Sequence, residues 1–184
     1  MVRLADIFLS LLGLIFFAPI FAFLFIIGFF VNRSPLFFQK RLGRNEKLFN
    51  LVKFRTMHKS TISTASHLVS NSCITPYGSI LRKTKLDELP QLWNVLKGDM
   101  SLVGPRPCLP QQIDLIEMRR SMDLFRVRPG ITGLSQISNI NMSDPELLTK
   151  KDAEMLVQFN LNSYFKIIIL TFLGKGFGDA AGNN

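Results

Sequence analysis

Residues 85–107 read KLDELPQLWNVLKGDMSLVGPRP, and this segment organises the rest of the chain. Pro90 is typical of a first helical position, where its missing N–H costs nothing, and Gly98 is typical of the residue that follows a helix. The pattern therefore predicts a short helix between these two residues. An adjacent pair of carboxylates, Asp87 and Glu88, comes just before the N-terminus of this helix.

Apolar residues recur at helical spacing in the predicted helix, and we expect them to face a core: Leu89, Leu92, Trp93 and Leu96. Burial of this face would hold the N-terminus of the helix, and the carboxylates beside it, in a fixed place. A helix N-terminus also attracts phosphate, because its first N–H groups have no partner within the helix.

The carboxylate pair has two interpretations. Asp87 and Glu88 can be capping acids favoured by the helix dipole, or they can form a catalytic pair. Nearby cations that would suit an anionic substrate favour the second interpretation: Arg82, Lys83, Lys85, Lys97 and Arg106. Adjacent carboxylates also repel each other, and a Mg²⁺ ion shared with substrate phosphates would relieve this repulsion. We therefore expect Asp87 and Glu88 to be catalytic and to bind Mg²⁺.

The composition limits the class of partner. The 184 residues carry a formal net charge of +9, which would suit a nucleic acid, an anionic membrane surface or a phosphorylated substrate. With 47% hydrophobic residues and a mean hydropathy of +0.24, the chain is more apolar than a typical soluble protein. These values favour the last two partners, and we expect no nucleic acid. Cys73 and Cys108 lack metal-ligand spacing and are expected to be free thiols in a reducing compartment.

Residues 7–31 are almost purely apolar and predict a membrane segment within residues 1–33. A signal peptide is less favoured, because the run is too long for its apolar region and no small-residue cleavage site follows. A straight helix of this length would extend roughly 37 Å, enough to cross a hydrocarbon core of about 30 Å. The basic residues that follow predict a cytoplasmic position for the next domain: Arg33, Lys40, Arg41 and Arg44.

Pro19 lies in the middle of the apolar run. It lacks an N–H and clashes with the carbonyl of Ile15, which predicts a kink. Each arm would then measure only about 18 Å, enough to enter one leaflet and return but too short to cross. From the residues alone, a kinked spanning helix and a re-entrant helix both stay open.

The rest of the chain predicts an α+β fold, mostly helical, in which one cytoplasmic domain occupies residues 34–175. Two strands, LFFQKRL and KLFNLVKF, are expected to form a β-hairpin around a turn at 43–46. Residues 58–75 predict a surface loop, because they are rich in Ser and Thr without periodicity. The glycine-rich residues 176–184 predict a flexible tail.

Short helices are expected at 77–85, 109–123 and 145–159, the last with its N-cap at Asp144. The second is expected to be amphipathic, with Ile113, Leu115 and Ile116 apolar and with Glu117, Arg119 and Arg120 on its polar face. Residues 164–173 form an apolar run that is too short to span a bilayer. This run is expected either to lie on the bilayer surface or to close the core.

Two sites outside the carboxylate pair have cations placed for phosphate. Lys53 and Arg55 alternate along the second strand, so both can point to one face of the hairpin. Arg106 lies between Pro105 and Pro107, and a rigid arginine suits phosphate recognition. The alternatives are a solvated strand face for the first pair and a structural turn with a surface arginine for the second.

Three motifs carry a resemblance to a known family: LDELPQLWNVLKGDMSLVGPRP at 86–107, VKFRTM at 52–57 and VRPGITGLSQI at 127–137. They closely resemble the bacterial sugar transferases called monotopic phosphoglycosyl transferases. The resemblance reaches about Asn139, and more loosely the C-terminal helices. Members of that family have a re-entrant membrane helix broken at a Ser-Pro pair, where this chain has Ala18-Pro19. The resemblance thus favours the re-entrant helix.

The resemblance also implies a reaction. In it, a sugar-1-phosphate passes from a UDP-sugar to polyprenol (undecaprenyl) phosphate at the bacterial inner membrane, UMP is released, and synthesis of a surface glycan begins. Asp87 is implied as the nucleophile that forms a covalent phosphosugar intermediate, and Glu88 as a residue that helps to hold Mg²⁺. The implied substrate-binding residues are Lys53, Arg55, Arg106, Arg128, Gly130 and Thr132.

The implied roles of the last three residues fit a pattern in the chain. Residues 126–133 combine two arginines with a glycine-rich turn, whose exposed N–H groups would cradle a nucleotide diphosphate. The competing hypothesis is a noncatalytic, basic, membrane-tethered protein that binds nucleic acid or anionic lipid. Such a protein has no need of a carboxylate pair within its positive surface. A phosphatase that uses the same aspartate is a third hypothesis.

Overall fold

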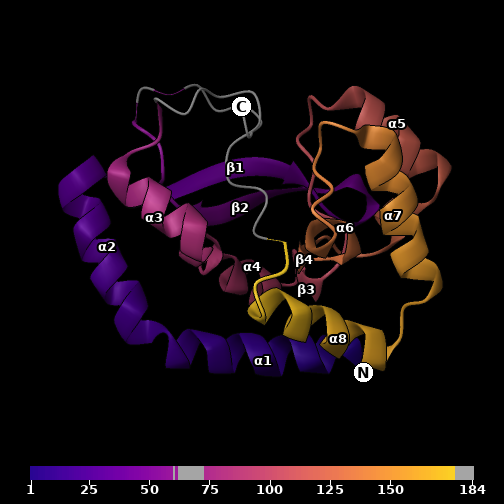
Figure 1. Cartoon of the computed structure of the whole chain (residues 1–184), viewed down its shortest axis with the longest axis horizontal. Helices are drawn as coiled ribbons and strands as arrows, with labels where there is room; N and C mark the ends of the chain where they lie inside the picture. Colours follow the sequence, from indigo (N-terminus) through magenta and orange to yellow (C-terminus); the bar gives the residue numbers. More distant parts are fainter. Residues whose placement is uncertain (60, 62–72, 177–184) are drawn as a thin grey trace.

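A computed structural model describes residues 1–59, 61 and 73–176. This part of the chain has an α+β fold that is mostly helical, with two small two-stranded sheets (Figure 1). The predicted loop at 58–75 and the predicted tail at 176–184 lie mostly outside the described residues.

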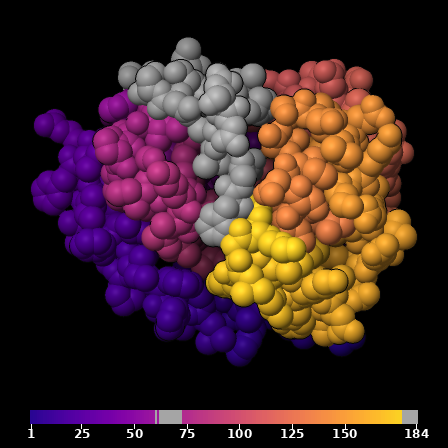
Figure 2. Space-filling view, in the orientation of Figure 1, coloured from indigo at the N-terminus to yellow at the C-terminus, as the bar shows by residue number. Residues whose placement is uncertain are grey.

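A bent pair of helices forms one border of the molecule (Figures 1 and 2). Helix α1 (Val2–Phe16) and helix α2 (Ala18–Asn32) are bent by 63° at a break around Phe17. The predicted kink is confirmed, and Pro19 stands in the first turn of α2, where its missing N–H needs no partner. Among the described helices, none alone has the length and apolar composition to cross a bilayer, whereas this bent pair together meets both criteria.

The predicted hairpin is confirmed. Strands β1 (Leu36–Leu42) and β2 (Leu48–Phe54) pair antiparallel, with Phe37 opposite Lys53, around a short turn at η1 (Arg44–Glu46). Phe54 at the end of β2 is fully buried and packs with Leu24 of α2 and Leu81. The hairpin is thus fixed to the second arm of the bent pair.

Helix α3 (Pro76–Thr84) begins and ends one residue earlier than predicted and packs closely on the end of the hairpin. The Thr75 hydroxyl caps it by accepting a hydrogen bond from the N–H of Gly78 at 2.9 Å. A Cβ atom at Gly78 would lie only 1.9 Å from the backbone oxygen of Thr56, so only glycine permits this approach. The approach brings the basic C-terminal end of α3 next to β2.

Helix α4 (Gln91–Lys97) begins one residue later than expected and ends at Gly98, which has a left-handed φ of 91°. The prediction of its buried face was wrong. The buried residues are Gln91, Asn94 and Val95, whereas Trp93 is 56% exposed.

The reason is the position of α4 between the hairpin and α1. The Asn94 side chain accepts from the N–H of Val52 at 3.0 Å and donates to the oxygen of Asn50 at 2.8 Å, so the face formed by Asn94 and Val95 covers β2. Leu92 packs instead against Gly13 of α1, which itself lies at the surface. The apolar face thus points toward the surface helix and away from the core.

A second sheet was not predicted. Strands β3 (Ser101–Val103) and β4 (Gly130–Thr132) pair in parallel, and each has only three residues. The two backbones come very close, since a Cβ atom at Gly130 would lie 2.1 Å from the nitrogen of Gly104. The motif at 86–107, which contains β3, and the motif at 127–137, which contains β4, are therefore joined directly through their backbones.

The C-terminal half is helical. It contains α5 (Ile113–Ser121), the short α6 (Leu134–Ile137), α7 (Pro145–Val157) and α8 (Leu161–Phe172). The predicted N-cap of α7 is confirmed, because the Asp144 carboxylate accepts from the N–H of Leu147 at 3.0 Å. Helix α8 closes the core along one face through Tyr164 and Ile167, and its other face stays exposed.

Helix α5 differs from its prediction in length and in its polar face. It is shorter than residues 109–123, because residues up to Gln112 form a turn in which the Gln112 side chain accepts from the N–H of Leu109. Arg119 was expected on the polar face but is buried, while Ile113 is 56% exposed. Arg119 is buried because it forms a 2.7 Å ion pair with Asp152 of α7.

Both ends of the bent pair are bonded to the rest of the chain. Near the start of α1, Arg3 donates to the oxygen of Val95 at 2.7 Å. Asp6, which is 2% exposed, accepts from the hydroxyls of Ser101 and Tyr164 at 2.9 and 2.8 Å. In the second arm, Tyr77 donates to the oxygen of Leu24 in the middle of α2 at 2.7 Å, and Asn32 at its end donates to the oxygen of Arg55 at 3.4 Å. The two ends therefore contact one and the same body.

Candidate active site

Asp87 and Glu88 lie in a single 3-10 turn, η4 (Leu86–Glu88), between α3 and α4. Lys85 ends α3 with a left-handed φ of 56°, which turns the chain into η4. The Asp87 side chain is buried, at 8% exposure, and the Glu88 side chain retains 19%. The turn thus holds two adjacent carboxylates in different surroundings.

Charges of both signs surround Asp87. Burial raises the pKa of Asp87 to about 6, and the negative charge of Glu88 adds to this increase. Lys53, Arg82 and Arg106 act in the opposite direction. As a result, this carboxyl group changes its protonation state close to neutral pH.

Lys53 of β2 is one of the predicted residues that the structure brings to Asp87. Burial of its ammonium group lowers the pKa of Lys53 to about 8, and the charge of Asp87 opposes this decrease. Lys53 and Arg55 share the ring of Phe37, with their charged groups 5.6 and 5.2 Å from its centroid, so their common face is confirmed.

Arg55 does not reach the carboxylates in the same way. Its Nε donates to the backbone oxygen of Ser34 at 3.1 Å, which links the start of β1 to the end of β2. Arg55 is also absent from the charges that shift the pKa of Asp87. In this arrangement Arg55 closes the base of the hairpin, and a contact with substrate stays a prediction.

Arg106 reaches the carboxylate pair from the turn at residues 104–107. Its Nη2 lies 3.3 Å from Oε1 of Glu88, and its side chain remains 31% exposed. The predicted grouping of Arg106 with the two carboxylates is therefore present. Partial exposure leaves this guanidinium accessible to an anionic ligand.

Two further cations lie at the site: Arg82, which was predicted among the nearby cations, and Arg41, which was not predicted there. Arg82 of α3 donates through Nε to the hydroxyl of Thr56 at 3.0 Å and acts on Asp87. Arg41 of β1 is 8% exposed; burial, followed by the charge of Arg106, lowers its pKa to about 10. The sequence contains one signal for Arg41. Phe37, Gln39 and Arg41 alternate along β1 and therefore point to the same face of the strand.

The structure places Arg128, Gly130 and Thr132 elsewhere. The Nε of Arg128 donates to the oxygen of Gly98 at 2.8 Å, at the C-terminal end of α4, whereas the carboxylates precede its N-terminal end. The hydroxyl of Thr132 is 2.7 Å from that of Thr171 in α8.

The prediction of exposed N–H groups in this loop was wrong at Gly130. Its N–H donates to the oxygen of Pro105 at 2.9 Å, because β4 pairs with the chain around β3. This loop therefore supports the turn that carries Arg106. Roles of Arg128, Gly130 and Thr132 in binding substrate stay predictions.

The carboxylate pair fits a Mg²⁺ ion that shares its ligands with a substrate. Asp87 and Glu88 offer hard oxygen atoms, and Mg²⁺ typically binds one or two carboxylates together with water and phosphate oxygens. A set of three or more metal-binding side chains does not occur in the described part of the chain. The donor set thus suits Mg²⁺ delivered with phosphate better than a metal enclosed by protein alone.

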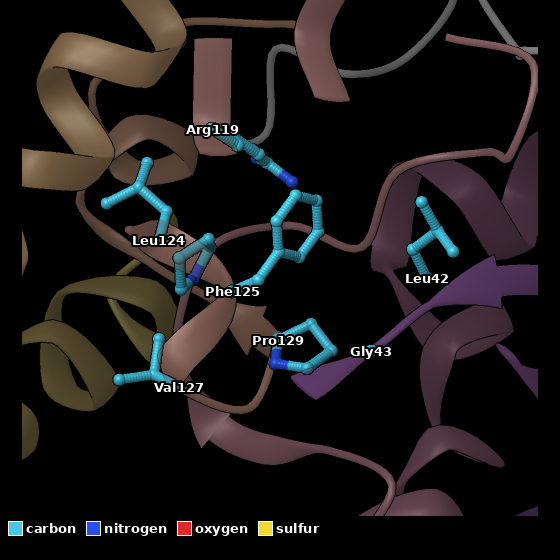
Figure 3. A pocket seen from close by; sticks show the side chains of 8 residues that line it. Leu42, Gly43, Arg119, Leu124, Phe125, Val127 and Pro129 are labelled. Atoms are coloured by element: carbon cyan, nitrogen blue, oxygen red, sulfur yellow. The ribbon is translucent and has the colours of Figure 1, made fainter. Parts of the chain in front are cut away.

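Pro105, in the turn that carries Arg106, lines a small pocket (Figure 3). Its walls are apolar except for the Arg119 side chain, which points toward Phe125 in this view. The pocket is lined by Leu42, Gly43, Pro105, Arg119, Leu124, Phe125, Val127 and Pro129.

Two carboxylates, four surrounding cations and an adjacent apolar helix pair define a site suited to phosphate chemistry near an apolar surface. Comparison with known proteins gives the family. Residues 1–175 match the family described as bacterial sugar transferase, and the chain belongs to this family.

Several relatives have names that describe their reactions. The UDP-glucose:undecaprenyl-phosphate glucose-1-phosphate transferase of Xanthomonas campestris pv. campestris is 39% identical over 151 residues, which are 75% of this chain and 31% of that protein. The undecaprenyl-phosphate galactose phosphotransferase of Salmonella typhimurium is 36% identical over 163 residues, covering 77% of this chain and 33% of that protein. The uncharacterized sugar transferase EpsL of Bacillus subtilis is 41% identical over 139 residues, covering 75% and 68%. This chain therefore spans about a third of the length of the first two.

Proposed function

We propose that this chain transfers a sugar-1-phosphate from a UDP-sugar to polyprenol phosphate and releases UMP. The names of the relatives from Xanthomonas and Salmonella support this reaction type. The observation that carries the proposal is the surroundings of Asp87, a buried carboxylate next to Lys53, Arg82 and Arg106. These cations would attract a diphosphate and bring its phosphorus atoms to the carboxylate.

The first step of the proposed reaction forms a covalent intermediate. An oxygen of the ionised Asp87 carboxylate attacks the β-phosphorus, which bears the sugar, and a new P–O bond forms. The bond between this phosphorus and the bridging oxygen breaks, and that oxygen leaves with UMP. The sugar is then held on Asp87 as an acyl phosphate, and the step requires no proton.

The second step regenerates the enzyme. A phosphate oxygen of polyprenol phosphate attacks the same phosphorus, and the bond to Asp87 breaks. The product is a polyprenyl diphosphate sugar, and Asp87 is again a carboxylate. Two displacements of this kind replace one difficult step with two easier ones.

The other charged groups would bind and orient the substrate. Arg106 contacts Glu88 and Lys53 acts on Asp87, and both are proposed to hold the diphosphate; Arg128 is a further proposed ligand. Bound Mg²⁺ would supply neutralisation of the phosphate charge, and Asp87 and Glu88 are the residues that would hold it. Glu88 would exchange part of its contact with Arg106 for the metal.

The bent pair α1–α2 is proposed to enter one leaflet of the bacterial inner membrane and return to the cytoplasmic side. Large apolar side chains are exposed along both arms and at the C-terminal end of α8, which supports contact with lipid: Leu4, Phe8, Phe16, Phe23, Phe30, Phe172 and the C-cap residue Leu173. Both ends of the pair, at Arg3 and Asn32, contact one body, as a re-entrant segment requires. This arrangement would bring the phosphate of a lipid acceptor to an interfacial site.

The covalent intermediate provides the direct test. The protein is incubated with a UDP-sugar and Mg²⁺ but without a lipid acceptor, and its peptides are analysed by mass spectrometry. We expect one equivalent of UMP and a phosphosugar adduct on the peptide that contains Asp87. Asp87→Asn should lose the adduct and turnover, because a neutral amide is a far poorer nucleophile at phosphorus. Full activity of this variant would refute covalent catalysis through Asp87.

Two comparisons separate the alternative functions. Glu88→Gln keeps the nucleophile, so its adduct should form slowly and recover in part at higher Mg²⁺; an adduct on Glu88 instead would reverse the assignment. Continued release of UMP without any lipid acceptor would indicate a phosphatase. A noncatalytic binding protein would release no UMP, and its affinity for anionic vesicles would be unchanged by Asp87→Asn.

A further inference from the structure

Two buried arginines donate to the two consecutive carbonyl groups at Arg106 and Pro107. The Nη1 of Arg119 donates to the oxygen of Arg106 at 2.7 Å, and the Nη1 of Arg41 donates to the oxygen of Pro107 at 2.9 Å. Arg119 is 3% exposed and Arg41 is 8% exposed. One arginine comes from α5 and the other from β1, so the turn is held from two separate elements.

Arg119 is itself fixed by residues of two further helices. Its Nη2 donates to Oδ2 of Asp152 at 2.7 Å, and Oδ1 of Asp152 accepts from the hydroxyl of Ser135 at 2.8 Å. Asp152 and Ser135 are both fully buried. A continuous chain of bonds therefore joins α6, α7 and α5 to the carbonyl of Arg106.

Stability alone does not account for this arrangement. A buried ion pair often contributes little net stability, because removal of both charges from water offsets their attraction. What the pair does determine is the orientation of one peptide group.

That peptide group is where the turn needs restraint. Proline rings fix φ at Pro105 and Pro107, but they leave φ and ψ of Arg106 free within the extended region. Rotation about either torsion would move the Arg106 guanidinium away from Glu88, now 3.3 Å distant. A bond to the Arg106 carbonyl restricts both torsions, because the oxygen can meet Arg119 in only one orientation.

We propose that Arg119 and Asp152 are positioning residues that act through the main chain of Arg106, with Arg41 restraining the next carbonyl. The proposal rests on the proposed function, in which Arg106 holds the diphosphate of the donor. Arg119 and Asp152 do not touch the substrate in this account. They set the place from which Arg106 does so.

A double-mutant cycle tests the proposal. Arg119→Lys keeps the charge but cannot donate to Arg106 and Asp152 in the same planar geometry. We expect it to lower kcat/KM for UMP release by about tenfold in the unmodified protein and less than about twofold in an Arg106→Ala background, because coupled residues are not additive. The same cycle can be measured as the affinity for UDP by calorimetry. Equal losses in both backgrounds would overturn the positioning role.

A neighbour on the same helix provides a matched control. Arg120 lies on α5 beside Arg119 but is exposed, where it pairs with Glu46 at the surface. Arg120→Lys should leave kcat/KM within about twofold, because exposed ion pairs contribute little. An effect as large as that of Arg119→Lys would show a general sensitivity of α5 and overturn the specific role.

A milder variant covers the case in which Arg119→Lys does not fold. Ser135→Ala removes one bond to Asp152 and retains both charges, so it should give a smaller loss that also vanishes with Arg106→Ala. Losses from Ser135→Ala that persist in that background would overturn the positioning role. An unmodified protein that neither binds UDP nor releases UMP would instead overturn the proposed function and this role with it.

Discussion

Burial shifts the pKa values of both Lys53 and Asp87 toward neutral pH, and the attraction between their opposite charges opposes this shift. Burial raises the pKa of Asp87 to about 6 and lowers the pKa of Lys53 to about 8. Between these values Asp87 is ionised and Lys53 is charged, which is the combination that the proposed attack on a diphosphate requires. The two residues are therefore in their active forms together over only a limited pH range.

This pair predicts a bell-shaped pH profile for the half-reaction without lipid. We expect the second-order rate constant for release of the single equivalent of UMP to rise as pH passes about 6, because Asp87 loses its proton, and to fall above about 8, because Lys53 loses its charge. Higher Mg²⁺ should shift the acid limb to lower pH, because a bound cation favours the carboxylate. Stopped assays of UMP release across the pH range measure both limbs.

Arginine at position 53 provides the contrast. Lys53→Arg should remove the alkaline limb, because a guanidinium keeps its charge at this pH. Lys40→Arg is the control, since Lys40 is exposed on the neighbouring strand. If the alkaline limb is unchanged in Lys53→Arg, another group is responsible for it.

Single residues show where sequence interpretation reached its limit at the site. Asp87, Glu88 and Arg106 lie within 20 positions of one another, and their grouping follows from local pattern. Arg41 was assigned to membrane topology and Arg119 to a polar helix face, because burial of an arginine depends on distant partners. Pro107 lies 66 positions from Arg41 and Asp152 lies 33 positions from Arg119, and no local period encodes either contact.

Elements with strong local signals were predicted well. The hairpin, the kink at Pro19 and the N-cap of α7 each depend on residues within a few positions, and all three are present. Helix α4 was oriented wrongly, because periodicity cannot distinguish an apolar face that meets a core from one that meets the surface helix α1. Strands β3 and β4 were missed, because three residues are too few to show alternation.

The close packing of α3 on the hairpin predicts a sensitive glycine. Gly78→Ala would place Cβ 1.9 Å from the oxygen of Thr56, so α3 must move, and we expect the free energy of unfolding to fall by about 3 kcal/mol. Activity should fall as well, because Arg82 of α3 acts on Asp87. Unfolding in detergent followed by circular dichroism measures the change.

Gly13→Ala is the matched control for this substitution. Its Cβ would lie 3.1 Å from the tip of the Leu92 side chain, which can move, and alanine favours a helix by up to about 1 kcal/mol. We therefore expect little change in the free energy of unfolding. Equal effects of the two substitutions would contradict the argument from the contact with Thr56.

At the scale of the whole molecule, the bent pair is restrained at both ends. Arg3 and Asp6 bind the first arm to α4, β3 and α8, and Tyr77 binds the second arm to α3. A spanning arrangement would need to separate one end from this body and break its hydrogen bonds. These contacts therefore favour a re-entrant topology independently of the proline.

The proposed topology predicts labelling from one side only. In a variant without Cys73 and Cys108, a cysteine placed directly after Met1 and another at position 33 should both react with an impermeant reagent from the cytoplasmic side. Inverted and right-side-out vesicles give the two measurements. Reaction of the N-terminal cysteine from outside would contradict the re-entrant segment.

Pro19 and the contacts of Asp6 should act together on this topology. Pro19→Leu restores an N–H that can bond to Ile15 and straightens the segment, so the fraction of N-terminal cysteine labelled from outside should rise. Asp6→Ala removes the bonds to Ser101 and Tyr164, and the combination should raise this fraction further, because nothing then ties α1 to β3 and α8 through that residue. Ile20→Leu, a change of similar size at the next position, is the control and should leave labelling unchanged. If the combined variant still reacts only from the cytoplasmic side, flanking charges determine the topology, and neither the proline nor Asp6 does so.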